Sequence, residues 1–160
     1  MKKAIYPGSF DPITIGHLDI IERALNIFDH LYVVVSINPS KQGFFTVEER
    51  LDMLSEVLKD RPNITVITND KLTVQKAKDI GASHIVRGLR ALTDFEYEFQ
   101  LTHANRVLDV KIDTLFFMTE QAHSFLSSSS VKEIATFGGN IDQFLPPYVA
   151  LKLKEKIKSR

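Results

Sequence analysis

The stretch "PGSFDPITIGH", residues 7–17, separates a short apolar run, "AIY" at residues 4–6, from "HLDIIERALNIF" at residues 17–28. The apolar run is typical of a strand, and the later segment places its apolar residues at helical spacing. The stretch between them carries two prolines, two glycines, a serine, an aspartate and a histidine. A loop of this composition adds little to a core, but it can hold an anion against the free N–H groups at a helix start. We therefore expect a strand, a ligand-binding loop and a helix in that order.

The rest of the chain repeats this alternation of strand and helix. The expected strands are residues 4–6, 31–37, 64–68, 84–86 and 114–118. The expected helices are residues 17–28, 46–59, 73–81, 94–108 and 130–139, with a further helical segment after Pro146-Pro147. Capping boxes are expected at Thr46 with Glu49 and at Ser130 with Glu133. Five strands separated by helices predict an α/β fold, a single domain over residues 1–160 built on a doubly wound, five-stranded parallel sheet.

The composition narrows the classes of partner and of chemistry. Lys plus Arg and Asp plus Glu number 20 each among 160 residues, so no overall basic field favours nucleic acid or an anionic membrane. The chain has no cysteine, which excludes disulfides, thiolate nucleophiles and cysteine-ligated metals, and is compatible with a reducing compartment. No apolar run is long enough to span a bilayer. We expect a cytoplasmic protein without nucleic-acid or membrane partners.

The chemically distinctive segments follow the expected strands. They are residues 7–17, "NPSK" at 38–41, "RGLR" at 87–90 and "SFLSSSS" at 124–130. Because ligands bind beyond the carboxyl ends of parallel strands, these segments are expected to meet at one edge of the sheet. Each alone is common on protein surfaces, but their shared position favours a common site.

The residue types at this edge suit phosphate groups. His17 falls in the first turn of a helix, and the serines at 127–130 precede another, so each helix start offers N–H donors to an anion. Lys41 provides a point charge, and Arg87 and Arg90 provide planar forks that match phosphate oxygens. Two such cradles indicate a nucleoside triphosphate or two phosphorylated substrates held together.

Two familiar phosphate-binding motifs are absent from the sequence. No GxGxxG follows the first strand, which disfavours a Rossmann dehydrogenase, and no GxxxxGK[ST] occurs, which excludes a P-loop NTPase. No clustered acidic pair stands at a strand end to hold a metal. Mg²⁺, if used, is expected to arrive on the nucleotide phosphates rather than on protein side chains.

"TIGH" at residues 14–17 resembles the T/HxGH signature of the nucleotidyltransferase superfamily. Further segments are similar, in the same order, to bacterial phosphopantetheine adenylyltransferases. They are "YPGSFDPITIGHLDII", "PSK", "FTVEER", "IVRGLRALTDFEYEFQL", "SFLSSSSVKEIATFGGNI" and "FLPPYV". The resemblance covers almost the whole chain, and RGLR followed by DFEYE and SSSVKE is its most specific part.

The resemblance implies the Rossmann-like nucleotidyltransferase fold and reversible adenylyl transfer from ATP to 4′-phosphopantetheine, giving dephospho-coenzyme A and pyrophosphate. Direct in-line displacement at the α-phosphate, without a covalent enzyme intermediate, is expected, with Mg²⁺ as cofactor. The resemblance also implies a homohexamer and feedback inhibition by coenzyme A. Two alternatives are a mononucleotide adenylyltransferase of the same superfamily and a non-catalytic nucleotide-binding module.

The resemblance also implies roles for individual residues. His17 matches the transition-state stabiliser, acting with Lys41 and Arg90 as the catalytic set. The residues matched to phosphopantetheine binding are Ser9, Lys41, Thr73 and Arg87. Those matched to ATP binding are Ser9, Phe10, His17, Gly88, Leu89, Arg90, Glu98, His123, Ser124, Phe125, Leu126, Ser127, Ser128 and Ser129.

Overall fold

A computed structural model describes residues 1–160, apart from the side chains of residues 92 and 93. The strands are β1 (Lys3–Gly8), β2 (His30–Ser36), β3 (Ile64–Asn69), β4 (His84–Leu89) and β5 (Asp113–Met118). The helices are α1 (Ile15–Leu25), α2 (Val47–Leu58), α3 (Thr73–Asp79), α4 (Leu92–Leu108), α5 (Ser128–Thr136) and α6 (Pro147–Lys158), with a short 3-10 turn, η1 (Gln121–His123).

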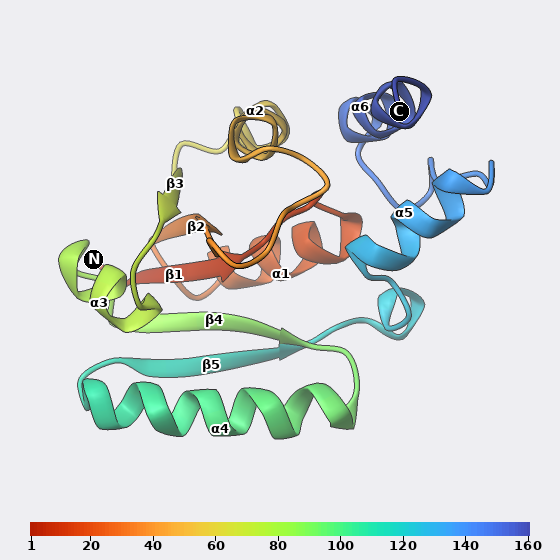
Figure 1. The fold of residues 1–160 in the computed structure, drawn as a ribbon. Helices are drawn as coiled ribbons and strands as arrows, with labels where there is room; N and C mark the ends of the chain where they lie inside the picture. Colours follow the sequence, from red (N-terminus) through yellow and green to blue (C-terminus); the bar gives the residue numbers. More distant parts are fainter.

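The five strands form one parallel sheet in the order β3-β2-β1-β4-β5 (Figure 1). All four strand pairs are parallel, as in the register of Ile5 with Tyr32 on one side of β1 and with Ile85 on the other. The expected doubly wound parallel sheet is confirmed. No helix in the described part of the chain has the length and hydropathy needed to cross a membrane.

Alternating side chains of the central strands divide the core into two layers. Tyr6, Val33 and Val86 point toward the face that α1, α2, α5 and α6 cover. Ile5 and Ile85 point to the opposite face, where α3 and α4 pack. Burial on both faces explains the nearly continuous apolar composition of β2.

The strand order changes direction at β1. The chain moves from β1 to β2 and β3 on one side, and then returns to place β4 and β5 on the other. The loops that follow β1 and β4 therefore diverge to opposite faces and leave a crevice at the carboxyl ends of the strands. This crevice is where the candidate site lies.

Two element boundaries differ from the expected ones in ways that matter for the site. β4 continues to Leu89 because residues 86–89 pair with the apolar residues 115–118 of β5, so most of RGLR is strand rather than loop. The helix expected at residue 130 begins at Ser128, with Ser127 as its N-cap. Ser127 pairs with Ser130 in the capping box, so the predicted box of Ser130 with Glu133 is wrong. The box of Thr46 with Glu49 is confirmed.

Candidate active site

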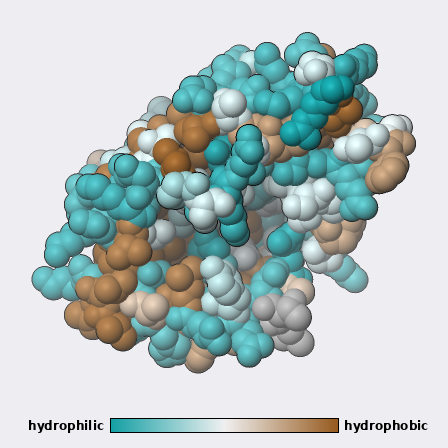
Figure 2. Space-filling model, in the orientation of Figure 1, coloured by the Kyte–Doolittle hydropathy of each residue, from teal (hydrophilic) through white to brown (hydrophobic). Residues whose placement is uncertain are grey.

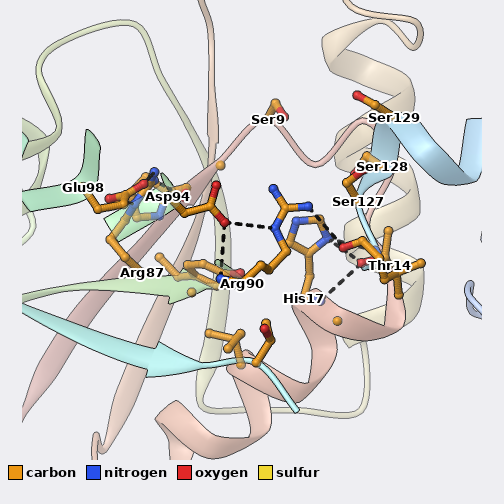
Figure 3. A pocket seen from close by; sticks show the side chains of 18 residues that line it. Ser9, Thr14, His17, Arg87, Arg90, Asp94, Glu98, Ser127, Ser128 and Ser129 are labelled. Atoms are coloured by element: carbon orange, nitrogen blue, oxygen red, sulfur yellow. Dashed lines mark hydrogen bonds and ion pairs between the residues drawn. The ribbon is translucent and has the colours of Figure 1, made fainter. Parts of the chain in front are cut away.

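A cavity of about 340 Å³ opens at the carboxyl ends of β1 and β4. Its walls come from the end of β1 and the loop after it, the first turn of α1, the end of β4, the first turns of α4, and the start of α5. The space-filling view shows the surface hollowed near the middle of this face (Figure 2). Cationic, hydroxyl and imidazole groups from segments far apart in the sequence line this one cavity (Figure 3).

His17 is fixed by the cap of α1. Thr14 is the N-cap residue, and its backbone N–H donates to Nδ1 of His17 over 3.0 Å. A nitrogen that accepts this bond carries no proton, so the neutral ring has its hydrogen on Nε2. Burial, and to a smaller extent the positive charge of Arg90, together lower the pKa of His17 to about 4. His17 is therefore a neutral N–H donor at a helix N-terminus, a suitable partner for a phosphate oxygen.

The loop after β1 folds back so that Phe10 supports the histidine. Phe10 has a φ of 45° and is 1% exposed, and its ring centroid lies 5.0 Å from that of His17. A Cβ at Gly8 would lie 3.0 Å from the Phe10 ring, so a larger residue there would push the ring aside. The Phe10 side chain belongs to the core, while the neighbouring Ser9 lines the cavity.

Arg87 and Glu98 form an ion pair in the cavity wall. Arg87 Nε donates to Glu98 Oε2 over 2.8 Å, and its Nη2 donates to Oε1. Burial alone would lower the pKa of Arg87, but the hydrogen bond and the charge of Glu98 outweigh it and raise that pKa above its usual value. The Nη1 group of Arg87 also donates to the carbonyl of Pro7 over 3.3 Å. Arg87 thus remains charged and is held in one orientation.

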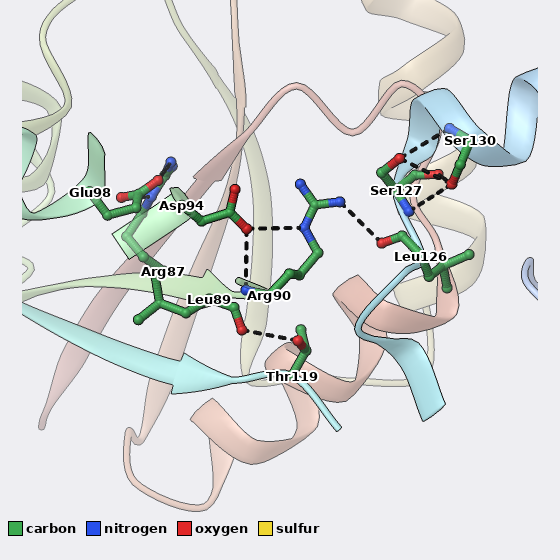
Figure 4. Close-up of polar contacts among 9 residues, drawn as sticks. All are labelled: Arg87, Leu89, Arg90, Asp94, Glu98, Thr119, Leu126, Ser127 and Ser130. Carbon is green, nitrogen blue, oxygen red and sulfur yellow. Dashed lines mark hydrogen bonds and ion pairs between the residues drawn. The ribbon is translucent and has the colours of Figure 1, made fainter. Parts of the chain in front are cut away.

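Arg90 lies just past β4, beside His17 (Figure 3), and is held from two sides (Figure 4). Its Nη1 donates to the carbonyl of Leu126 over 3.2 Å, and its Nε lies 3.7 Å from Asp94 Oδ2. Asp94 also accepts a bond from the Arg90 backbone N–H over 3.3 Å. The guanidinium therefore connects the start of α4 with the segment that leads into α5.

The serine segment forms the opposite wall. Ser127 caps α5 by accepting a bond from the Ser130 N–H over 3.0 Å, and residues 127–129 line the cavity. Ser128 Oγ donates to the carbonyl of Pro12 over 2.8 Å, which ties the start of α5 to the loop after β1. Hydroxyl groups and the N-terminus of a helix together make a site for an anion.

Comparisons with known proteins agree with this geometry. The profile of a family described as cytidylyltransferase-like matches residues 5–134. A phosphopantetheine adenylyltransferase of Caldanaerobacter subterraneus subsp. tengcongensis is 51% identical over 158 residues, which are 99% of this chain and 99% of the relative. The chain belongs to the phosphopantetheine adenylyltransferase family.

A solved structure with lower sequence identity has the same fold as this chain. It is a Vibrio parahaemolyticus protein that carries a provisional nicotinate-nucleotide adenylyltransferase name. The two share 21% sequence identity with a TM-score of 0.71, over 98% of this chain and 95% of the other. The likeness supports the nucleotidyltransferase architecture expected from the sequence.

Most of the residues that the family resemblance assigned to the site do meet at the cavity. Ten of its lining residues belong to that set: Ser9, His17, Arg87, Gly88, Arg90, Glu98, Leu126, Ser127, Ser128 and Ser129. Glu98, assigned to ATP, reaches the cavity as the partner of Arg87. Leu89 contributes a carbonyl that accepts a bond from Thr119 Oγ1 over 3.0 Å, and this carbonyl holds the chain after β5.

Two residues assigned to phosphopantetheine lie outside this cavity. Lys41 is exposed on the loop between β2 and α2 and does not line the cavity. Thr73, the first residue of α3, lines a neighbouring cavity of about 20 Å³ that shares Pro7, Arg87 and Glu98 with the main one. The Arg87–Glu98 pair therefore lies between the main cavity and this smaller one beside α3.

The first part of the segment at residues 123–129 also lies outside. His123 ends the turn η1, and its Nδ1 is buried without a hydrogen-bond partner in the described structure. Ser124 Oγ donates to the carbonyl of Gln121 over 2.9 Å. Phe125 is 62% exposed and contacts Phe144 edge to face.

Three residues that shape the site were assigned no role from the sequence. Thr14 fixes the tautomer of His17, Asp94 holds Arg90, and Thr119 lines the cavity at the end of β5. The pairing of Asp94 with Arg90 could have been predicted, because a carboxylate four residues after an arginine at a helix start favours an ion pair. The cap by Thr14 could have been predicted too, because this threonine precedes a helical pattern.

Proposed function

We propose that this chain catalyses reversible adenylyl transfer from ATP to 4′-phosphopantetheine, giving dephospho-coenzyme A and pyrophosphate. The observation that carries the proposal is the neutral His17, which stands at a helix start in a cavity that arginine and serine side chains also line. Full-length similarity to a curated phosphopantetheine adenylyltransferase supports the choice of acceptor.

The chemistry fits a site without a protein nucleophile. An oxygen of the acceptor phosphate forms a bond to the α-phosphorus of ATP, and the bond from that phosphorus to the bridging oxygen of the β-phosphate breaks. Pyrophosphate leaves with that bridging oxygen and its electron pair. A phosphate monoester is already anionic near neutral pH and needs no strong general base. The protein has to align two polyanions and stabilise the charge that develops between them.

The described side chains divide this work between them. His17 Nε2–H donates to the α-phosphate, where negative charge builds up in the transition state. Arg90 and the serines at 127–129 hold the β- and γ-phosphates as pyrophosphate leaves. Arg87, held by Glu98, faces the acceptor side, and Lys41 adds its charge to the acceptor phosphate from the loop after β2.

Mg²⁺ is proposed as the cofactor, carried by the ATP phosphates. Within the described residues no group of three or more acidic or histidine side chains is placed to hold a metal ion. The cavity offers one carboxylate near Arg90, that of Asp94, and the serine hydroxyls line the opposite wall. This donor set fits an ion whose main ligands are phosphate oxygens and water. When bound, Mg²⁺ would neutralise charge on the phosphates.

We further propose that the chain forms a homohexamer in the cytoplasm and that coenzyme A inhibits it. Exposed apolar side chains support self-association, among them Tyr97 at 66%, Val107 at 87% and Leu108 at 58%. In the space-filling view such side chains gather over the end of α4, at lower left (Figure 2). Coenzyme A contains the same phosphopantetheine arm as the acceptor, so competition for the acceptor side is expected.

The decisive experiment measures pyrophosphate release from Mg·ATP with different acceptors supplied separately. Release that depends on 4′-phosphopantetheine is expected. Release with nicotinamide or nicotinate mononucleotide alone would retain the role of His17 and replace the acceptor. No release with any acceptor would favour a nucleotide-binding module without turnover.

A further inference from the structure

Asp11 is a buried carboxylate that lies behind the site rather than in it. It is 8% exposed and does not line the cavity. Its Oδ2 accepts a bond from the Phe44 N–H and its Oδ1 accepts one from the Phe45 N–H, each over 2.8 Å. Both ends of one carboxylate are thus used to hold two successive backbone groups of a distant loop.

That loop, residues 37–46, carries Lys41. The ends of the loop are also attached, by the Ile37 N–H, which donates to the carbonyl of Asn69 over 2.8 Å, and by the buried side chain of Phe45. Around Lys41 the remaining bonds are those of the Lys41 N–H to the carbonyl of Asn38 and of Ser40 to the side chain of Asn38. These bonds are local and do not attach the loop to the rest of the site. The bonds to Asp11 fix the loop to the segment that contains Ser9 and His17.

The same carboxylate reaches the third wall of the cavity. Lys132, on the second turn of α5, places its Nζ 3.3 Å from Asp11 Oδ2 and 5.7 Å from the centroid of the Phe44 ring. Arg50 of α2 completes the connection by donating to the carbonyl of Ser9 over 2.9 Å. Asp11 therefore lies where the loop after β1, the loop after β2 and helix α5 meet.

Gly43 shows how closely the loop sits on this carboxylate. A Cβ at Gly43 would lie 2.8 Å from the Phe45 carbonyl oxygen and 3.4 Å from Asp11 Oδ2. Any side chain there must displace the loop from its seat. Glycine, which has no side chain, is therefore the residue that fits where the loop contacts Asp11.

We propose that Asp11 is a positioning residue, which sets the acceptor loop at residues 37–46, and with it Lys41, in register with His17. The proposal deepens the proposed function and rests on it, since Lys41 acts there on the acceptor phosphate. Loss of the anchor should weaken the acceptor side selectively. The ATP side keeps its own supports, namely the cap of α5 and the bonds of Arg90.

Asp11→Asn is the principal test. The asparagine amide has one oxygen to accept bonds from the N–H groups of Phe44 and Phe45. Its NH2 group would then face one of these N–H groups, and two donors cannot form a hydrogen bond. We expect the KM for 4′-phosphopantetheine to rise about tenfold, the effect of one lost hydrogen bond to a charged group. The KM for ATP should change less than about threefold on the same scale.

Gly43→Ala is the second variant, because it displaces the loop while leaving Asp11 and all charges in place. It should shift the same Michaelis constant in the same direction. Asp142→Asn is the matched control: it makes the same chemical change in an exposed carboxylate that pairs with Lys154. Its kinetics should equal those of the unsubstituted protein.

Each outcome is informative, because acceptor-dependent turnover by the unsubstituted protein is measured first. Absence of that turnover contradicts the proposed function and not the role of Asp11. With turnover present, a selective rise in the acceptor KM in Gly43→Ala supports the proposal even if Asp11→Asn fails to fold. Two outcomes would overturn the proposal, because each would show that Asp11 serves folding only. One is an equal change in the KM values for ATP and for 4′-phosphopantetheine. The other is a smaller share of active protein with both KM values unchanged.

Discussion

At the scale of single residues, the site depends on a histidine that is kept from becoming a cation. A protonated imidazole would form a stronger electrostatic bond to phosphate in the ground state. A neutral donor in a fixed position instead matches charge that appears only during the reaction. Thr14 sets the tautomer, and burial and Arg90 set the protonation state.

His17→Ala should therefore affect turnover more than binding. We expect kcat to fall by about 10²- to 10³-fold, as when one oxyanion donor is removed, with the Kd for ATP nearly unchanged. Steady-state kinetics and calorimetric titration with ATP separate the two effects. A loss found mainly in ATP affinity would contradict the role given to His17.

The ionisation of His17 can be observed directly. Long-range ¹H–¹⁵N NMR should show a neutral Nε2–H ring that titrates near pH 4 in the free protein, not near 6.5. Because the unfolded chain binds this proton more readily, the free energy of unfolding should rise with pH between about 4 and 6.5. This contribution is complete above that window and is lost as pH falls toward 4. In His17→Gln it should be absent.

Lys41→Ala tests the acceptor side at the same scale. Removal of the ammonium should raise the KM for 4′-phosphopantetheine by about tenfold, with little effect on the KM for ATP. Initial rates with each substrate varied in turn give both constants. An unchanged acceptor KM would count against any contact between Lys41 and the acceptor phosphate.

At the scale of elements, the cavity wall depends on a pair that joins a strand to a helix. Arg87 on β4 and Glu98 on α4 are held by two hydrogen bonds, and Glu98 is 6% exposed. Glu98→Gln leaves the arginine without its counter-charge and should lower the free energy of unfolding by about 1–3 kcal/mol. Urea denaturation measures the change. Glu56→Gln, in the exposed pair with Lys59, should have no measurable effect and serves as the control.

The elements also show what sequence can predict. The order of strands and helices follows from apolar periodicity, and it was enough to bring His17, Arg87, Arg90 and the serines to one edge. The end of β4 could not be predicted, because arginine and glycine are poor strand formers and their pairing with β5 decides the matter. The position of the loop that carries Lys41 could not be predicted from the sequence either, because it depends on hydrogen bonds between Asp11 and residues 33 and 34 positions further along the chain.

At the scale of the whole molecule, α4 leaves apolar surface without cover. Phe95 and Phe99, 45% and 50% exposed, lie one helical turn apart with their ring centroids 5.7 Å from each other, and Tyr97 is 66% exposed. Patches of this kind mark interfaces in soluble proteins.

Tyr97→Asp should therefore reduce the sedimentation coefficient of the proposed homohexamer toward that of a smaller species. Leu151→Asp places the same change on α6, at a side chain that is 53% exposed, and should leave the assembly intact. Sedimentation velocity at several protein concentrations distinguishes the two. An assembly that tolerates Tyr97→Asp as well as the control would exclude this part of α4 from the interface.

The central position of β1 has a consequence for how such proteins diversify. In the proposed function, Lys41 and Thr73 lie on the β2 and β3 side of that strand and meet the acceptor, whereas Arg90 and the serines at 127–129 lie on the β4 and β5 side and meet the nucleotide. Arg87, near the end of β4, is the acceptor contact that crosses this division. Mutations can therefore accumulate in one half while the other stays under purifying selection. An ancestor of this architecture could exchange one acceptor for another through changes in two loops, while its ATP-binding residues stayed unchanged. The same division offers protein engineers a natural boundary for building chimaeras.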